Sequence, residues 1–332
     1  MISKSKRLFA ATIFAGASLL TPASAQEEVD LTFASFSVGG SWYVYASTIA
    51  EFLRDVLPKG SNVDATPLGG GVVNSLLIDA DKAQIALSHA MTNKWATNGT
   101  VAYEAPVTTT RALVGGLDTY YLTVTAVDAE PGTGLREYFE TVNPDAKIGA
   151  NPGGSVATFA GKLMLTAANA SEEEVEERGG AYLSMPLGTI KDSFPTGVVD
   201  ATPQIITRGH PAITEISENN SVTILQPEDD VLETMRSTYG FDLGTLPADS
   251  FRGQSVDVKL PTTSTTVIVS EEMSDDLAYT ITKAIVENAD KLAAAHQALA
   301  GFDPTKGWQP EVVNLPLHPG AEKYYRERGW LK

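Results

Sequence analysis

The sequence predicts an α/β protein built from two domains. Residues 31–57 show the pattern of a strand, a glycine pair and an amphipathic helix, and residues 146–168 repeat this order. Short strands and helices alternate around both stretches, which is typical of a parallel sheet with helices on its faces. The length of 332 residues is sufficient for two separate cores.

The first of these stretches predicts an anion-binding turn. A short strand leads to Gly39-Gly40, and Ser41 is the predicted N-cap of the following helix. The apolar stripe of that helix consists of Tyr45, Ile49, Phe52, Leu53 and Val56. A helix start offers free backbone N–H groups and the positive end of the helix dipole, and both attract carboxylates. Trp42 and Tyr43 would exclude water there, although each taken alone is more simply a core residue.

Two further strand ends are predicted in the same domain. Strands at 62–66 and 84–88 precede helices at 72–79 and 91–97, with a glycine turn in the first of these connections. Ligands of parallel sheets gather at the carboxyl ends of the strands. We therefore expect one site formed by residues 39–43, 69–74 and 88–93.

The chain is expected to pass to the second domain at Asp118, between strands at 111–117 and 120–127. It is expected to return within the extended segment 256–269, which Pro261 interrupts. The predicted division is a signal peptide at 1–25, a first domain at 26–117, a second domain at 118–255, and the return crossing with the rest of the first domain at 256–332.

The remaining elements are predicted from local patterns. Ser171 and Glu174 form a capping box at the start of a helix whose acidic face is solvated. A single long amphipathic helix is predicted at 275–299, and a short helix at 321–328 ends the chain. Other predicted elements are strands at 182–186, 198–201 and 222–225 and a helix at 228–239.

The N-terminus predicts export. Lys4, Lys6 and Arg7 precede an apolar run at 8–20, and a small-residue site for cleavage near Ala25 follows, as in a secretory signal peptide. The apolar run is shorter than the ~20 residues that a membrane span needs. The sequence has no cysteine, which excludes disulfides, cysteine zinc sites and a lipid anchor on an N-terminal cysteine. We expect a periplasmic protein without a lipid anchor.

The charge restricts the partners. The formal net charge is −17, and removal of the basic signal peptide makes it more negative. Such a surface argues against nucleic acid and anionic membranes as partners. A small organic anion remains compatible, since a local group of backbone N–H donors can hold an anion within a negative field.

One motif indicates an enzyme as the alternative. The stretch 153–157 approximates the G-x-S-x-G turn of secreted serine hydrolases, with Ser155 as the nucleophile. Glycine–serine turns before helices are also common as helix caps and anion sites, which is the simpler interpretation. A hydrolase would also need an acid and a histidine, for which Asp200 and then His210, His296 or His318 are formally available.

Metal and cofactor chemistry has no support in the sequence. The four histidines show no metal-ligand spacing, and no nucleotide-binding motif is present, so neither a metal site nor a cofactor is expected. His89 and His296 are expected to be surface or helix-packing residues.

Several motifs, in order along the mature chain, resemble the TAXI family of solute receptors, which serve tripartite ATP-independent periplasmic (TRAP) transporters. The most specific is the C-terminal 317–325, LHPGAEKYY, followed by Glu327 and Gly329. The stretches 39–43, 70–74, 153–155, 199–201 and 209–213 also resemble family motifs. Departures occur at 36–38, at 88–91 and at 202–208, which lie at expected cleft loops.

The resemblance implies a two-lobed type II periplasmic binding protein fold, each lobe a mixed sheet flanked by helices. It implies a receptor without enzymatic activity that captures a dicarboxylate or an acidic amino acid, similar to glutamate or 2-oxoglutarate, between the lobes. The receptor would deliver this ligand to the integral membrane subunits of a TRAP-type transporter. The C-terminal motif is expected to be structural.

The same resemblance suggests the ligand-binding residues. Lobe I would supply Gly40, Ser41, Trp42, Tyr43, Gly71, Asn74 and Ser88. Lobe II would supply Ser155, Thr158, Gln204 and Arg208. Arg111 is a second candidate for carboxylate pairing, and the alternative for both arginines is a surface or hinge salt bridge of small energetic value.

Overall fold

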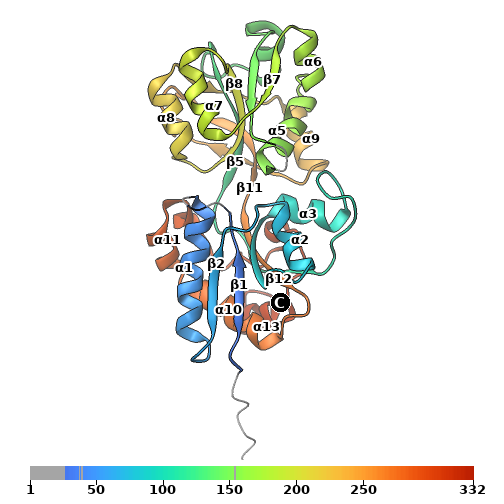
Figure 1. The fold of residues 1–332 in the computed structure, drawn as a ribbon, viewed down its shortest axis with the longest axis vertical. Coiled ribbons are helices and arrows are strands. Elements are labelled where there is room, and N and C mark those ends of the chain that lie inside the picture. Colours follow the sequence, from blue (N-terminus) through green and yellow to red (C-terminus); the bar gives the residue numbers. More distant parts are fainter. Residues whose placement is uncertain (1–26, 37, 39, 153–154) are drawn as a thin grey trace, which may run out of the picture.

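The computed structural model describes residues 27–332 except 37, 39, 153 and 154. The proposed signal peptide and parts of both glycine turns therefore lie outside the described residues. The chain forms two lobes, each built on one β-sheet (Figure 1). Both sheets are mixed and flanked by helices, as the family resemblance implies, whereas the alternation of elements alone predicted parallel sheets.

The sheet of lobe I has five strands in the order β2-β1-β3-β12-β4. The first three strands are parallel, and β12 runs antiparallel to both of its neighbours. The lobe consists of β1 (Asp30–Ala34), α1 (Ser41–Val56), β2 (Asn62–Thr66), α2 (Val73–Asp79), β3 (Ile85–His89), α3 (Ala90–Asn98), β4 (Thr110–Val114), β12 (Thr265–Ser270), α10 (Asp275–Glu287), α11 (Ala289–Ala295), η3 (Gln297–Gly301), α12 (Pro310–Val313) and α13 (Pro319–Glu327).

The sheet of lobe II has seven strands, in the order β10-β11-β5-β8-β6-β7 with β9 paired to β5. The lobe consists of β5 (Tyr120–Val127), α4 (Leu135–Glu137), η1 (Tyr138–Val142), β6 (Lys147–Ala150), α5 (Val156–Ala167), α6 (Glu172–Glu177), β7 (Ala181–Ser184), α7 (Leu187–Ser193), η2 (Phe194–Thr196), β8 (Ala201–Ile206), α8 (Pro211–Asn219), β9 (Val222–Ile224), α9 (Asp229–Ser237), β10 (Asp242–Leu246) and β11 (Val258–Thr263).

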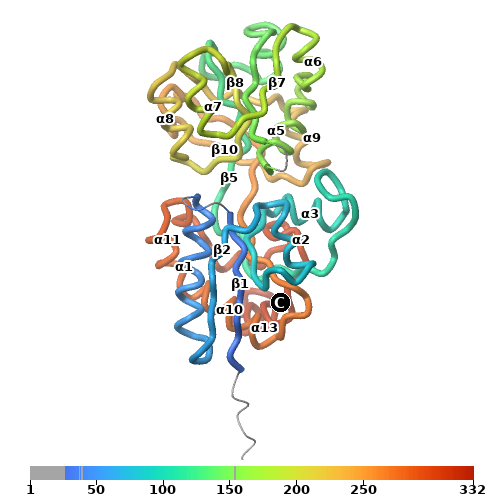
Figure 2. The backbone as a smooth tube through the Cα atoms, in the orientation of Figure 1, coloured from blue at the N-terminus to red at the C-terminus, as the bar shows by residue number. Residues whose placement is uncertain are grey.

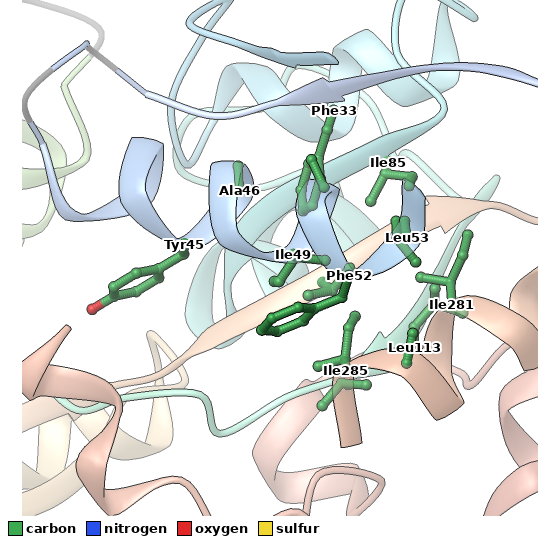
Figure 3. Packing of buried hydrophobic residues seen from close by; sticks show 14 of the residues in the cluster. Phe33, Tyr45, Ala46, Ile49, Phe52, Leu53, Ile85, Leu113, Ile281 and Ile285 are labelled. Atoms are coloured by element: carbon green, nitrogen blue, oxygen red, sulfur yellow. The ribbon is translucent and has the colours of Figure 1, made fainter. Parts of the chain in front are cut away.

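The core of lobe I follows the alternation of its strands. Phe33 and Ile85 face α1 and α10 and are fully buried against them (Figure 3). Their neighbours Ala34 and Ala86 face the opposite side and pack with Ile78 of α2. Tyr45, Ile49, Phe52 and Leu53 of the predicted apolar stripe of α1 therefore cover one face of the sheet. The prediction of Val56 in this stripe is wrong, because Val56 is 49% exposed at the last residue of the helix.

Two chain segments connect the lobes. The chain changes sheets between β4 and β5, and again between β11 and β12, where only Ser264 separates the strands (Figure 2). The connecting strands lie side by side, since Thr262 and Thr263 pair with Tyr121 and Tyr120. The predicted interruption at Pro261 is wrong, because Pro261 lies inside β11 opposite Leu243. On the β5 side only the next two residues are paired, so the missing N–H of proline is tolerated there.

A further contact between the lobes comes from α3. The indole N–H of Trp95 donates to the Tyr239 carbonyl at 2.8 Å, and its ring packs edge-on against Phe241 at a centroid distance of 6.1 Å. Met91 and Trp95 of α3 lie in one apolar cluster with lobe II residues such as Leu122 and Met235. The lobes are therefore packed against each other on this side.

Two predictions about lobe II and the C-terminal region need correction. The strand expected at 198–201 is β8, which begins at Ala201 and includes the residues expected to form a loop. Pro203 lies inside this strand opposite Val124, and its ring packs against Gly161 of α5. The helix expected at 275–299 ends at Glu287, because Asn288 leaves the helical conformation and its side chain caps the Ala284 carbonyl at 2.7 Å.

The capping box predicted at Ser171 is confirmed. The Ser171 hydroxyl accepts a hydrogen bond from the Glu174 backbone N–H at 3.3 Å, and the Glu174 carboxylate accepts one from the Ser171 N–H at 2.8 Å. The Ser171 hydroxyl also donates to the Glu174 carboxylate at 2.7 Å, and this bond together with the one from the Ser171 N–H lowers the pKa of Glu174. Helices α7 and α8 and strand β10 were not predicted, because their segments are short.

Candidate ligand-binding site

Helix α1 begins at the predicted turn, one residue earlier than expected. Gly40 is the N-cap in an extended conformation, and its carbonyl accepts from the Tyr43 N–H at 3.1 Å. The prediction of Ser41 as the N-cap is wrong, because glycine is itself a suitable N-cap and the helix adopts it. Ser41 and Tyr43 are half-buried in the first turn. The N–H groups of this turn thus begin the helix without a side-chain cap.

Three aromatic side chains form one wall, which we call the aromatic wall: Trp42, His89 and Tyr120. The ring centroids of Trp42 and His89 are 4.5 Å apart, and those of His89 and Tyr120 are 5.0 Å apart. Trp42 and His89 are 5% and 7% exposed, so both are fixed by packing. Burial lowers the pKa of His89 to about 3, so the imidazole is neutral at physiological pH.

Gly71, in the turn before α2, lies against both the aromatic wall and lobe II. A Cβ atom at Gly71 would lie 2.7 Å from Cγ2 of Val156, 2.9 Å from Cδ2 of His89 and 3.6 Å from Cη2 of Trp42. Val156 is the first residue of α5 in lobe II. The starts of α1 and α5 and the glycine turn of α2 therefore meet at one place between the lobes.

The lobe II side of this place is the turn that begins α5. Ser155 is the N-cap, and its carbonyl accepts from the Thr158 and Phe159 N–H groups at 3.1 Å. The Thr158 hydroxyl donates to the Asn151 carbonyl at 2.7 Å. The Asn151 amide in turn donates to Oε1 of Gln204 at 2.9 Å. Thr158 and Gln204 thus hold the turn in position against β8.

Asn74 and Ser88 are fully buried beneath the lobe I turns. The Asn74 amide donates to the Leu87 carbonyl at 2.7 Å, and its Oδ1 has no hydrogen-bond partner among the described residues. The Ser88 hydroxyl donates to Oδ1 of Asn93 at 2.6 Å. Both side chains tie strand ends to their neighbours, which fixes the geometry of the turns that carry Gly71 and His89.

The two candidate arginines have different surroundings. Arg111 forms an ion pair with Glu271 and donates to the Thr108 and Thr110 carbonyls, so it is occupied by a surface salt bridge. Arg208 is exposed just beyond β8 and forms no ion pair within the described chain. Its charge lowers the pKa of Tyr121, which burial raises, so it lies near the crossing strand β5.

Comparison with known proteins identifies the family. A family model described as the NMT1-like family matches residues 33–329. The chain belongs to the NMT1-like family. The more specific resemblance to TAXI receptors remains a prediction.

Solved structures similar to this NMT1-like chain have the same architecture. MatC (Rpa3494) from Rhodopseudomonas palustris with bound malate matches with a TM-score of 0.52 and 12% identity, over 91% of this chain and 97% of that one. The periplasmic binding protein BugD matches with a TM-score of 0.50 and 16% identity, over 91% and 95%. At these identities the likeness shows the fold, and it confirms the periplasmic binding protein fold predicted from the sequence.

The aromatic wall of the NMT1-like chain contains two residues that sequence reasoning missed. His89 was expected at the surface or in helix packing, and Tyr120 was assigned only to a strand. A single histidine carries no spacing signal, and Tyr120 reaches the wall from the first interlobe crossing. The one usable signal was the departure at 88–91 from the family pattern, which placed a histidine at a strand end.

Ser155 does not have the partners that a hydrolase nucleophile needs. No histidine of the described chain hydrogen-bonds to it, and His89, the histidine near Val156, lies against Trp42 and Tyr120 without an acid partner. We expect that a fluorophosphonate probe does not label the NMT1-like protein, as judged by in-gel fluorescence beside a known serine hydrolase. Labelling that disappears in Ser155→Ala would instead establish a hydrolase.

Proposed function

We propose that this NMT1-like protein is an exported solute receptor that captures a small organic anion between its lobes. The observation that carries the proposal is the meeting of Gly71, Trp42 and Val156, which brings two helix starts from separate lobes together. The proposed ligand is a dicarboxylate or an acidic amino acid, similar to glutamate or 2-oxoglutarate. MatC, which shares the fold, holds malate.

The chemistry of the site supports an anionic ligand. The first turn of α1 provides backbone N–H groups next to Gly40, and Arg208 provides a cation near the hinge that forms no ion pair with any described residue. Charge-assisted hydrogen bonds to a carboxylate are stronger than neutral ones, and they gain further when closure excludes water. The neutral His89 adds a polar contact without adding charge.

The lobes would part to admit the ligand and close on it afterwards. Gly71 already contacts Val156 in this structure, so admission requires separation about the two crossings. The remaining lining would come from Ser41, Tyr43 and Ser155, while the buried Asn74, Ser88, Thr158 and Gln204 would support the turns that carry it. Among the described residues, no helix combines the length and apolar character of a membrane span. We place the receptor in the periplasm and propose that it delivers its ligand to TRAP-type integral membrane subunits.

A thermal-shift screen tests the proposal. The panel contains C4–C6 dicarboxylates, 2-oxo and 2-hydroxy acids, and acidic amino acids. At a concentration of about 100 Kd, a bound acid adds about 2.7 kcal/mol to the free energy of unfolding, which raises Tm by several degrees. An unchanged Tm with every acid contradicts the proposed ligand class.

The matched variants Arg208→Gln and Arg236→Gln separate a specific contact from general charge. Both arginines are exposed, but Arg236 pairs with Glu233 on α9. Loss of a charged hydrogen bond costs about 1.5–3 kcal/mol, so Arg208→Gln should weaken binding by about 10- to 100-fold. Arg236→Gln should bind as the wild type does. Equal affinity of both variants would remove Arg208 from the site.

A further inference from the structure

A buried hydrogen-bond chain leads from the aromatic wall into the hinge. The indole N–H of Trp42 donates to the Thr265 hydroxyl at 2.9 Å, and this hydroxyl donates to Oδ2 of Asp118 at 3.0 Å. The Thr265 backbone N–H donates to Oδ1 of Asp118 at 2.8 Å. Trp42, Thr265 and Asp118 are 5%, 0% and 5% exposed. The chain is thus closed to water along its length.

The three residues come from three separate parts of the fold. Trp42 lies in the first turn of α1, Asp118 lies in the first crossing at 115–119, and Thr265 begins β12 directly after the second crossing. The Leu117 N–H also donates to the Thr265 carbonyl at 3.2 Å. The Asp118 carboxylate therefore fastens one crossing to the other and at the same time to the wall of the proposed site.

The direction of each hydrogen bond in this chain is fixed. An indole N–H can only donate, so the Thr265 hydroxyl must accept from Trp42. A hydroxyl has a single proton, which Thr265 gives to Asp118. The carboxylate must therefore act as an acceptor with both oxygens, and a protonated acid or an amide can satisfy only part of this pattern.

We propose that Asp118 is a positioning residue for ligand binding, which acts through Thr265 to fix the indole of Trp42 at the interlobe site. The step to ligand affinity rests on the proposed receptor function. The positioning of the indole does not, because it follows from the hydrogen-bond chain alone.

The surroundings of Asp118 make the effect depend on pH. The Tyr45 hydroxyl of α1 faces the carboxylate and helps to lower its pKa, and Tyr120 of β5 lies beside it. His296 and His89 contact these tyrosines, and burial lowers the pKa of both imidazoles. No basic side chain of the described residues pairs with Asp118, and burial raises its pKa to about 6 against the lowering effect of the Thr265 bonds.

The sign of the pH effect separates positioning from simple stability. A carboxyl with a raised folded pKa contributes stability that is present at low pH and is lost as the pH rises through about 6. The positioning of the Trp42 indole depends on pH in the opposite sense. It improves as the pH rises, because Asp118 accepts both hydrogen bonds from Thr265 only when its carboxylate is ionised. Acid should therefore loosen the Trp42 indole while the contribution of Asp118 to stability increases.

The test uses the full mature chain and the matched pair Thr265→Val and Thr266→Val. Both threonines are fully buried, but the Thr266 hydroxyl has no partner among the described residues. Asp118→Asn and the rescue variant Thr265→Ser complete the set. The readouts are the pH dependence of the tryptophan emission that Trp42→Phe abolishes and the Kd for malate at neutral pH.

Wild type, Thr266→Val and Thr265→Ser should show an emission change with a midpoint near pH 6. Asp118→Asn and Thr265→Val should lack this transition. Loss of one buried hydrogen bond should weaken malate binding by about 2- to 10-fold in both. Since the pKa of His89 is about 3, its titration does not interfere.

If the emission transition is unchanged in Thr265→Val, the proposed positioning of Trp42 is overturned, whether or not the Kd for malate changes. A lost transition with unchanged malate affinity overturns the link from Asp118 to binding. If malate binds to no form of the protein, the emission measurement still tests the positioning of Trp42. The absence of binding then contradicts the proposed ligand and not the positioning. If Asp118→Asn does not fold, the pair Thr265→Val and Thr265→Ser decides alone.

Discussion

Gly320→Ala should destabilise the protein by about 3 kcal/mol, at the upper end of the cost of inserting an atom into a packed region. A Cβ atom at Gly320 would lie 2.1 Å from the carbonyl oxygen of Asp275 and 2.8 Å from the backbone nitrogen of Tyr279. Both are backbone atoms of α10, so no side-chain rotation relieves the overlap. The helix α13 must move away from α10, which separates Tyr324 from Tyr279.

The cost should exceed the gain that alanine normally brings to a helix. Gly320 is the second residue of α13, so alanine gains there at most the ~1 kcal/mol that it gains over glycine in a helix interior, and the overlap must overcome this. Movement of α13 also disturbs the contact between Nε2 of His318, its N-cap, and the Met273 carbonyl at 2.9 Å. Equilibrium unfolding in urea measures the effect as a lower midpoint at an unchanged slope.

Gly301→Ala is the matched control for this substitution. A Cβ atom at Gly301 would meet nothing within 4 Å, and this residue also lies in the C-terminal part of lobe I. Its free energy of unfolding should stay within about 0.5 kcal/mol of the wild-type value, as is usual for surface substitutions. A Gly320→Ala protein as stable as the control would show that the contact between α13 and α10 is not tight.

The C-terminal motif thus shows which structural roles a sequence can predict. The motif was expected to be structural, and His318 caps α13 through Nδ1 while its Nε2 faces the Met273 carbonyl at 2.9 Å. Since Nδ1 accepts from an N–H, the imidazole is neutral, in agreement with the lowering of its pKa by burial. Asp275, whose carboxylate lies 3.8 Å away, therefore faces a neutral ring.

Elements with a strong local signal were predictable. The apolar period of α1 and the strand–turn–helix order at β6 and α5 follow from the sequence, because burial of one face requires that spacing. Strand β8 was displaced in the prediction because Pro203 usually marks a loop. Its pairing with both β5 and β6 outweighs that local preference.

The break between α10 and α11 was not predictable for a different reason. Neither glycine nor proline marks it, and the residues around Asn288 are compatible with a continuous helix. Leu292 of α11 is fully buried in the same cluster as Leu53 of α1. Tertiary packing therefore decides where the helix turns, and a local pattern does not contain that information.

The sequence predicted the turns of the candidate site, but it did not predict the aromatic wall or the residues that hold this wall in place. Gly71 lies in a glycine turn, and Trp42 lies in the first turn of the helix that Gly40 caps; the sequence marks both places clearly. Asp118 and Thr265 are 147 residues apart, and Trp42 and Thr265 are 223 residues apart. These partners meet only because both crossings pass the start of α1, so no spacing rule could pair them.

Gly71→Ala should weaken ligand binding by roughly 10- to 100-fold, which corresponds to the 1–3 kcal/mol cost of overpacking. The added methyl group would lie 2.7 Å from Cγ2 of Val156 and 2.9 Å from Cδ2 of His89. Val156 can shift with lobe II, but His89 is held between Trp42 and Tyr120. The lobes can therefore yield only by staying further apart, which leaves the closed state incomplete.

The measurement is the Kd of the acid that gives the largest thermal shift, with Gly188→Ala as the control. A Cβ atom at Gly188 meets nothing within 4 Å, so this variant should bind as the wild type does. Adding Val156→Ala to Gly71→Ala removes the contact across the lobes and leaves the contact with His89, so affinity should recover in part. Full affinity in Gly71→Ala alone would mean that the ligand does not require these two turns to meet, and the proposed closure would have to be abandoned.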